Sequence, residues 1–365
     1  MRNRFLIGLT LPLALLGACT TPTAPSAATG ASVTTGSDTS TAAPAATSLQ
    51  SRVLMAVVSK GLPGVTIFDA ATDQQICQAK MDVAPHEAAF SLDGRILYVP
   101  IYSSANIGQP GPDGHAINFM RTADCSIEHV LDTGDIKRPH YVEVGASGLL
   151  YVTAEQNQSI LVIDPQQRKI IATLPTGSSN THFFAVARDE KRLFTSNVSD
   201  KTLSVIDIPA RKLVATVNAG ASNQRMTVSP DDRWFVTSLW QAKQIAFYRT
   251  RDLALDFTVA IDGAPFVARF SPDGRYLYNM GMEPDKQPAG IRVWKIDVAT
   301  RQVVATTSAA LGVGTGGIQV NPANGLLYLT AYNGQVSVLN PDTLRLIRRF
   351  PAADTPDGIF FGRVR

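Results

Sequence analysis

The chain has 365 residues, of which 45% are hydrophobic and 17% charged, and its formal net charge is +3. This composition supplies ample apolar material for a core and excludes a wholly disordered chain. Neither a basic stripe nor an acidic tail is present, so nucleic acid is not an expected partner.

The N-terminus has the pattern of an export signal rather than of a folded element. Two arginines precede an apolar stretch over residues 5–16, which is too short to span a bilayer, and the letters LGAC end it at Cys19. This ending resembles the bacterial lipobox, which implies a signal peptide over residues 1–18 and a lipidated, palmitate-bearing Cys19. Thr20 in place of aspartate favours the outer membrane of the bacterial cell envelope. A plain secretory leader is the alternative.

Residues 19–49 are expected to be a flexible tether. Apart from Cys19 they consist almost wholly of Ala, Ser, Thr, Pro and Gly. Such a segment cannot bury enough apolar surface to offset the entropy lost on ordering. The folded domain is therefore expected over residues 50–365.

Two cysteines remain after the leader, Cys77 and Cys125. In an exported protein an even pair indicates a disulfide. Both are expected in outer strands or their turns on neighbouring repeats, which allows contact. Their positions within the repeat differ, so two free thiols are the alternative.

From residue 86 onward the chain repeats one pattern: a short apolar strand, a turn such as SLDG, SPDD or SPDG, and an aromatic-led strand. Seven copies follow at intervals of about 40–50 residues, without helical periodicity. The third copy predicts strands over residues 182–187, 192–196, 202–207 and 212–218. Four strands repeated at this period predict an all-β fold, the β-propeller, in which each repeat is one blade.

The last copy, DGIFFGRV, supplies one strand before the chain ends. The segment that starts at residue 51 supplies three strands, RVLMAVVS, VTIFD and QICQAKM, and has no first strand. Placing both termini in one blade closes the ring and removes two open sheet edges. The sequence therefore predicts a seven-bladed propeller whose N- and C-terminal strands share a blade.

The strands YVPIY, YVTAE, FTSNV and YLTAY resemble the YVTN repeat of exported bacterial propellers. FSPDGRYLY is similar to repeats of phosphogluconolactonase-type propellers and of the methylamine dehydrogenase heavy chain. The resemblance covers roughly residues 51–365. It implies the fold and no particular activity, because the matching letters are hairpin residues.

Seven equivalent positions stand at the start of the innermost strands, and they are expected to surround one opening of the central channel. Three of the five histidines of the chain occupy this position on adjacent blades. Asp357 lies next to His86 in the closed ring. The seven positions are His86, His140, His182, Gln224, Phe266, Gly316 and Asp357. Further candidates on the same rim are Glu155, Asn197 and Trp240.

Three converging imidazoles and a carboxylate suit a divalent metal such as Zn²⁺ or Cu²⁺, which makes His86, His140 and His182 candidate ligands. The same side chains suit a small ligand or an anion. Hydrogen bonds to loop carbonyls and channel water are the structural alternative.

Catalytic motifs are missing from the sequence. It has no nucleophile elbow, zinc-protease motif, phosphate loop or haem-attachment motif, and the GxGxxG over residues 312–317 lies between two strands. The leading interpretation is a lipid-anchored, monomeric binding protein that holds a small molecule, a metal or a protein partner at the channel mouth. One alternative is a lactonase-like hydrolase or lyase with a histidine as general base. The other is an accessory subunit of a periplasmic redox system of the quinoprotein type.

Overall fold

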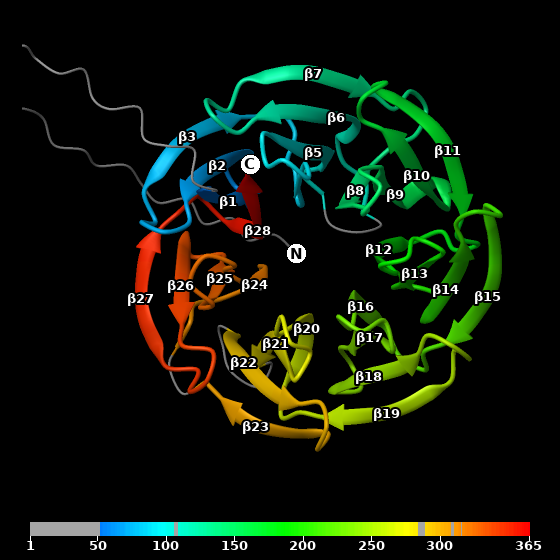
Figure 1. The fold of residues 1–365 in the computed structure, drawn as a ribbon, viewed down its shortest axis with the longest axis vertical. Helices are drawn as coiled ribbons and strands as arrows, with labels where there is room; N and C mark the ends of the chain where they lie inside the picture. The colour runs from blue at the N-terminus through cyan, green and yellow to red at the C-terminus, as the bar shows by residue number, and fades with distance from the viewer. Residues whose placement is uncertain (1–51, 106–108, 284–288, 308–309, 315) are drawn as a thin grey trace, which may run out of the picture. The chain divides into compact units, whose positions relative to one another are not determined.

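The computed structural model describes residues 52–105, 109–283, 289–307, 310–314 and 316–365. These residues form seven four-stranded antiparallel sheets arranged as a ring, with one short 3-10 turn, η1 (Glu155–Asn157) (Figure 1). The predicted all-β, seven-bladed propeller is confirmed. The predicted signal peptide, Cys19 and the tether lie outside the described residues. No described helix has the length and apolar character that a membrane span needs.

Blades are numbered here from the first complete repeat, and their strands run outward from the channel. The first three blades contain, in blade 1, β4 (Ala89–Phe90), β5 (Ile96–Ser103), β6 (Asp113–Arg121) and β7 (Ile127–Asp132); in blade 2, β8 (Pro139–Val144), β9 (Leu150–Ala154), β10 (Ser159–Asp164) and β11 (Lys169–Pro175); and in blade 3, β12 (Thr181–Val186), β13 (Arg192–Asn197), β14 (Thr202–Asp207) and β15 (Lys212–Asn218). The next three contain, in blade 4, β16 (Asn223–Val228), β17 (Trp234–Leu239), β18 (Gln244–Arg249) and β19 (Leu255–Ala260); in blade 5, β20 (Ala264–Phe270), β21 (Tyr276–Glu283), β22 (Gly290–Asp297) and β23 (Gln302–Thr306); and in blade 6, β24 (Ile318–Val320), β25 (Leu327–Ala331), β26 (Gln335–Leu339) and β27 (Leu346–Pro351). Blade 7 contains β28 (Pro356–Val364), β1 (Arg52–Ser59), β2 (Gly64–Asp69) and β3 (Gln75–Lys80).

The hairpin chemistry of the repeat explains why the predicted boundaries of blade 3 lie within one residue of the observed strands. In the turn between β12 and β13, Oδ1 of Asp189 accepts a hydrogen bond of 3.0 Å from the backbone N–H of Lys191. Glu190 in the same turn has a φ of 50°. Aspartate turns of this kind end strands by local interactions alone.

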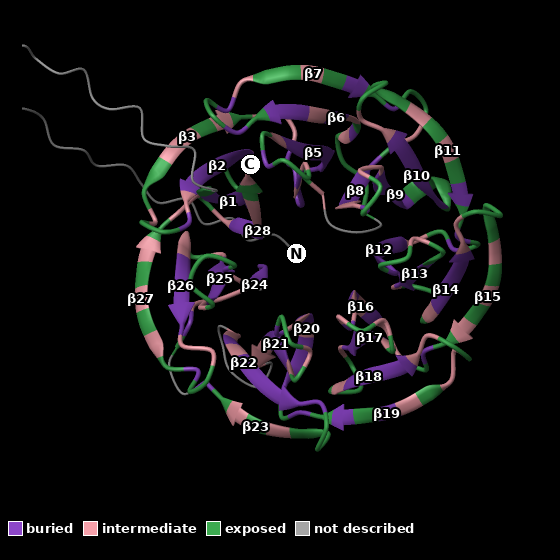
Figure 2. Cartoon of the chain, in the orientation of Figure 1, coloured by how far each residue is buried: buried purple, intermediate pink, exposed green. Residues whose placement is uncertain are grey.

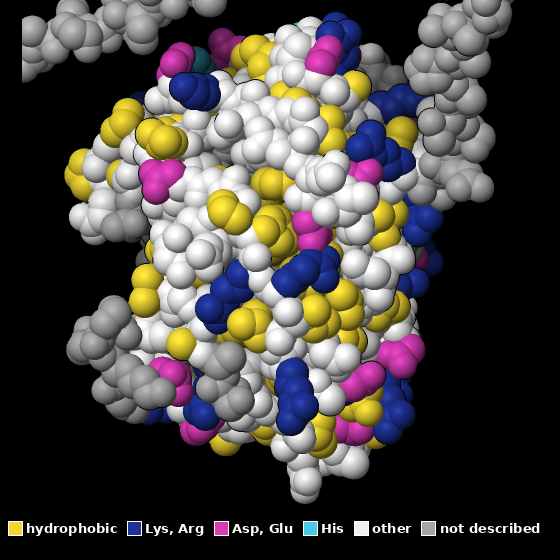
Figure 3. Space-filling view, turned by 90° about the vertical axis from the view of Figure 1, so that its left-hand side faces the viewer, with side chains coloured by type: hydrophobic (Ala, Val, Ile, Leu, Met, Phe, Trp, Pro, Cys, Tyr) yellow, Lys and Arg dark blue, Asp and Glu magenta, His cyan; other side chains and the backbone are white. Residues whose placement is uncertain are grey.

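Burial changes in a regular way from the inside of a blade to its rim. The third strands are buried on both faces, as in β10 and β14, whereas the fourth strands alternate between exposed and half-buried residues, as in β15 (Figure 2). The third strand packs against both neighbouring blades, while the fourth forms the outer edge. On the rim, separate apolar side chains lie among charged ones of both signs (Figure 3).

The described residues form seven apolar clusters, one between each pair of neighbouring blades. The cluster between blades 7 and 1 combines residues of β1 and β2 with residues of β4, β5 and β6. The core is therefore a ring of equivalent interfaces, each of which needs both of its blades.

Blade 7 contains both ends of the folded domain. Its inner strand β28 pairs antiparallel with β1, from Arg52 opposite Val364 to Ser59 opposite Pro356. A disulfide joins Cys77 in β3 to Cys125 in the turn between β6 and β7, with Cα atoms 5.7 Å apart. Strand pairing and the disulfide thus hold blade 7 together and attach it to blade 1.

Replacing Ile359 with alanine tests the closure. Its side chain is 1% exposed in the cluster between blades 6 and 7. We expect the Ile359→Ala variant to lose about 2–5 kcal/mol of unfolding free energy in urea denaturation. The matched Ile347→Ala variant changes a 48% exposed residue on the rim strand β27, and should lose about 1 kcal/mol or less. Equal losses would contradict a packed closing strand.

Candidate functional site

The innermost strands all begin on one face of the propeller, and this register brings distant residues together at the channel. His140 lies at the start of β8, His182 at the start of β12, and His86 just before β4. The ring centroids of His86 and His140 are 5.2 Å apart, and those of His140 and His182 are stacked at 4.1 Å. Asp357, in β28, lies 3.6 Å from Nδ1 of His86 through its Oδ2 atom. All four side chains are buried.

Each imidazole has its own hydrogen-bond partner. Nε2 of His86 lies 3.1 Å from the carbonyl oxygen of Ser103, and Nδ1 of His140 lies 3.3 Å from that of His182. Nδ1 of His182 lies 3.3 Å from Oε2 of Glu155. Among the described residues, no hydrogen bond engages Nε2 of His140 or of His182.

The geometry does not support the predicted three-histidine metal site. The described residues contain no group of three or more His, Cys, Asp and Glu side chains placed to hold a metal ion. His140 and His182 stack face to face at an interplanar angle of 21°, whereas ligands of one metal point their nitrogen atoms at a common centre. The rings also bind three different partners.

Glu155 is the centre of a buried polar network. Its two carboxylate oxygens accept hydrogen bonds of 3.0 and 2.8 Å from the hydroxyl of Tyr102. Arg138 approaches the same carboxylate at 4.0 Å and forms a closer ion pair of 2.5 Å with Asp113. The ring of Tyr102 also contacts His86 and His140, with centroids 4.4 and 4.6 Å apart. Glu155 thus connects the histidine stack to Arg138.

A second network surrounds Asp357. Lys60 lies 3.2 Å from its Oδ2 atom, and Nη2 of Arg225 lies 3.8 Å from its Oδ1 atom. Nη2 of Arg225 is also 2.7 Å from Oε1 of Glu87, but these atoms are not aligned for a hydrogen bond. As a result, both oxygens of Glu87 and Nε of Arg225 are buried without a hydrogen-bond partner among the described residues.

Burial determines the protonation of the cluster. Burial, reinforced by the charge of Lys60, lowers the pKa of His86 to about 3. Burial also lowers the pKa of His140 well below its usual value, with His182 adding to the effect, and it lowers that of His182 although Glu155 opposes it. The three imidazoles are therefore neutral at pH 7.

The pKa values of the buried carboxyl groups are shifted in different directions. Burial raises the pKa of Glu87 to about 7 although Arg225 opposes the shift. For Glu155 burial also acts to raise the pKa, but His182, Tyr102 and Arg138 outweigh it and lower the pKa. The pKa of Asp357 is likewise lowered, because Lys60 and other cations outweigh burial.

Among the described residues, the other predicted site residues form no hydrogen bond or ion pair with the side chains of these networks. Asn197 is buried within blade 3, where its amide and carbonyl groups bind Thr181, Thr195, Thr202 and Ser204. Trp240 packs edge-on against Phe266 at 5.7 Å. Gln224 is half-buried and accepts a hydrogen bond from Ser196 through its backbone carbonyl. Asn197 thus has a structural role in its blade.

Sequence reasoning missed four charged residues of the site: Lys60, Glu87, Arg138 and Arg225. Glu87 and Arg225 directly follow the anchor positions 86 and 224. A charge next to an anchor position is the signal that could have found these two, because buried charges need a partner or a function. A cavity of about 400 Å³ lies beside Arg138 and Glu155.

The low pKa of His86 predicts a dependence of stability on pH. Unfolded histidine binds a proton near pH 6.5, whereas His86 in the folded chain does so near pH 3. The stability that the neutral, buried His86 contributes is therefore complete above pH 6.5 and is lost as the pH falls towards 3. In urea unfolding across this range, His86→Asn should reduce the slope of stability against pH by about 1.4 kcal/mol per pH unit. An unchanged slope would contradict a neutral, buried His86.

Comparisons with known proteins agree with the fold. Residues 144–266, in blades 2 to 5, match the family model of the cytochrome D1 heme domain. Hydrazine synthase of Kuenenia stuttgartiensis is 17% identical with a TM-score of 0.64, over 77% of this chain and 90% of that one. A proposed 6-phosphogluconolactonase from Bacteroides uniformis is 14% identical with a TM-score of 0.67, over 86% of this chain and 100% of that one. The dihydro-heme d1 dehydrogenase NirN in complex with DHE is 18% identical with a TM-score of 0.58, over 84% and 74%. No curated protein matches the sequence. The chain is thus a propeller that is similar, over residues 144–266, to the cytochrome D1 heme domain.

Proposed function

We propose that the chain is a binding protein whose histidine-side channel opening holds a carboxylate-bearing tetrapyrrole of the heme d1 kind. The observation that carries this proposal is the buried cluster of neutral imidazoles with two sets of cations beside it. His140 and His182 stack at 4.1 Å. Arg138 lies 4.0 Å from Glu155, and Lys60 and Arg225 lie 3.2 and 3.8 Å from Asp357. Neutral imidazoles accept a metal or a proton, while guanidinium and ammonium groups recognise carboxylates.

Unsatisfied polar atoms in the cluster support a ligand. Both oxygens of Glu87 and Nε of Arg225 are buried without aligned partners among the described residues. A buried polar group without a partner is costly, and a bound molecule or ordered water removes that cost. Within the described residues the cluster therefore keeps unused hydrogen-bonding capacity, which the proposed ligand would use.

The comparisons favour this ligand class over other anions. The stretch similar to the cytochrome D1 heme domain, residues 144–266, contains Glu155, His182 and Arg225. NirN, a structural neighbour, was solved with its ligand DHE. In this proposal Nε2 of His140 would bind the iron, and His182, which Glu155 fixes through Nδ1, would support the His140 ring by stacking on it. Arg225 and Arg138 would bind carboxylates. A heme supplies redox chemistry, which agrees with the redox interpretation of the sequence.

Titration with hemin tests the proposal. We expect about one equivalent to bind per chain with a shift of the Soret band, which reports ligation by imidazole. His140→Ala should abolish the shift, and Arg225→Gln should weaken binding at least tenfold, because a charge-assisted contact to a carboxylate is lost.

His129→Ala provides the matched control for the titration. His129 lies on the outer strand β7 and packs against Phe119, so its removal should leave hemin binding unchanged. Binding that is equal in the wild type, His140→Ala and His129→Ala would contradict the site. No saturable binding at all would contradict the ligand class.

One contact favours a second candidate function, hydrolysis with His182 as general base. Glu155 lies 3.3 Å from Nδ1 of His182 and orients the ring, as a carboxylate does for a catalytic histidine. The proposed 6-phosphogluconolactonase from Bacteroides uniformis has the same fold. Turnover of a sugar lactone that His182→Ala abolishes, without hemin binding in the wild type, would favour this function instead.

The location of the protein is a further part of the proposal, and the lipobox-like ending at Cys19 supports it. We expect wild-type protein in the membrane fraction of a bacterial host, because two or three acyl chains give stable anchoring. Cys19→Ser should move it to the soluble fraction, whereas Cys77→Ser/Cys125→Ser should remain with the membrane. Wild-type protein in the soluble fraction would contradict a lipid anchor.

A further inference from the structure

A large cleft lies on the propeller face opposite the histidine cluster. Its volume is about 760 Å³. Innermost strands begin at the histidine face, so the turns between first and second strands and between third and fourth strands emerge at the other face. The cleft is lined by such turns: Asp93 and Arg95 before β5, Thr122 and Ala123 after β6, and Pro165, Gln166 and Arg168 after β10.

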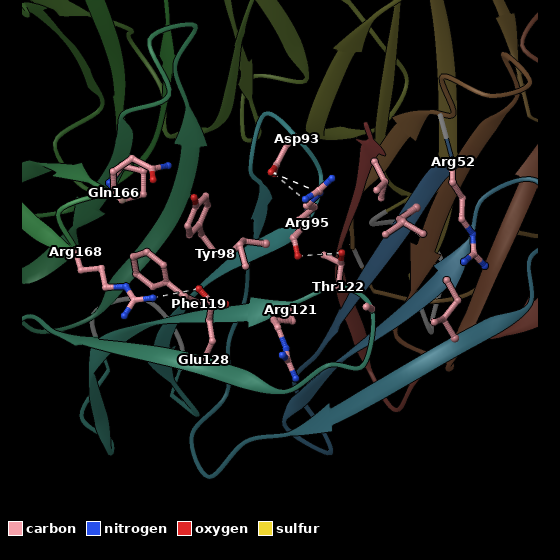
Figure 4. A pocket seen from close by; sticks show the side chains of 16 residues that line it. Arg52, Asp93, Arg95, Tyr98, Phe119, Arg121, Thr122, Glu128, Gln166 and Arg168 are labelled. Atoms are coloured by element: carbon pink, nitrogen blue, oxygen red, sulfur yellow. Dashed lines mark hydrogen bonds and ion pairs between the residues drawn. The ribbon is translucent and has the colours of Figure 1, made fainter. Parts of the chain in front are cut away.

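The cleft spans the closing blade 7 and the next two blades of the ring, blades 1 and 2. Blade 7 contributes Arg52 and Leu54 of β1, Ile76 of β3 and Val364 of β28, while blades 1 and 2 contribute the rest. In Figure 4, Arg52 lies at one end and Arg168 with Gln166 at the other, and Tyr98 and Phe119 lie between them. A molecule bound here would connect the blade that contains both chain ends to two other blades.

The lining combines an apolar floor with a cationic rim. Tyr98 and Phe119 meet edge to face, with ring centroids 5.0 Å apart. The charged residues of the lining are four arginines against two acidic side chains. The aliphatic and aromatic floor is formed by Leu54, Ile76, Ile96, Tyr98, Phe119 and Val364. The arginines of the rim are Arg52, Arg95, Arg121 and Arg168.

The rim arginines pair with acidic residues in ways that a ligand can replace. Arg95 is 4.0 Å from Asp93 and Arg168 is 3.4 Å from Glu128. Arg52 and Arg121 form closer pairs of 2.6 Å, with Asp69 and Asp124. The side chains of all four arginines are about half exposed or more. Exposed pairs of this kind contribute little to stability because solvent screens them. An anion that also fills the apolar floor can therefore bind the loosely paired Arg95 and Arg168, and can compete with the exposed carboxylates for Arg52 and Arg121.

We propose that this cleft binds an amphiphilic small molecule with an elongated apolar body and an anionic group at each of its two ends. The floor matches the apolar body, and arginines at both ends of the cleft match anionic groups at the ends of the molecule. The volume suits a molecule of several fused or linked rings. This second site is independent of the histidine cluster and of its ligand.

The repeat itself supplies the competing explanation, because arginines at these turn positions also occur in blades that do not line the cleft. Arg233 in blade 4 lies 4.0 Å from Asp231, as Arg95 lies from Asp93. Arg249 pairs with Asp252 three residues on, as Arg121 pairs with Asp124. If these arginines only stabilise hairpins, replacing Arg95 and Arg121 should affect ligand binding no more than replacing Arg233 and Arg249. The chain therefore offers a matched control within its own fold.

The experiment measures binding of the aromatic disulfonate bis-ANS by fluorescence and calorimetry to the folded, full chain. Wild-type protein should bind about one equivalent, more weakly as salt increases, since exposed charges are screened. Arg95→Gln/Arg121→Gln should weaken binding at least tenfold, while Arg233→Gln/Arg249→Gln should stay within about twofold. Gln166→Glu, which adds an acidic group to the rim, should also weaken it.

Three results would overturn the proposal. They are equal loss of affinity in both arginine double variants, no saturable binding to the wild type, and a glutamate-rich peptide that binds the cleft more tightly than bis-ANS. The two proposed sites are separable, because His140→Ala should retain bis-ANS binding and Arg95→Gln/Arg121→Gln should retain hemin binding.

Discussion

The packing of each sheet against two neighbours is the constraint on which the whole molecule depends. Seven apolar clusters lie between seven blades, and none is complete without both of its blades. The strand β28 pairs with β1, so that the two ends of the folded domain lie in one sheet and the ring is closed. The disulfide between Cys77 and Cys125 adds a covalent bond between that sheet and blade 1. An open array would expose two apolar sheet faces and their edges.

Closure also builds the site. His86 and Asp357 lie near opposite ends of the folded chain, yet they are 3.6 Å apart because blade 7 is next to blade 1. His140 and His182 come from two further blades, and each occupies the same register. The grouping of these side chains at one opening is therefore a property of the closed ring and of no single repeat. Burial at this opening lowers the pKa values of the three imidazoles and so keeps them neutral.

The fold could be predicted from the sequence because its signals are local. Aspartate turns such as Asp189 to Lys191 fix strand ends, and the half-repeats at the two ends indicate closure. The convergence of His86, His140 and His182 followed from register. The metal interpretation depended on ring orientation, which tertiary contacts with Ser103, His182 and Glu155 determine. Asn197 shares the expected face but turns into its own blade, and repeat letters alone do not reveal such side-chain directions.

A crystal structure of the chain grown with hemin tests the central claim most directly. The account predicts density at the histidine-side opening, in contact with Nε2 of His140 and with carboxylates on Arg225 or Arg138. Density confined to another surface, or an opening filled only by water with Glu87 and Arg225 bound to it, would contradict the claim.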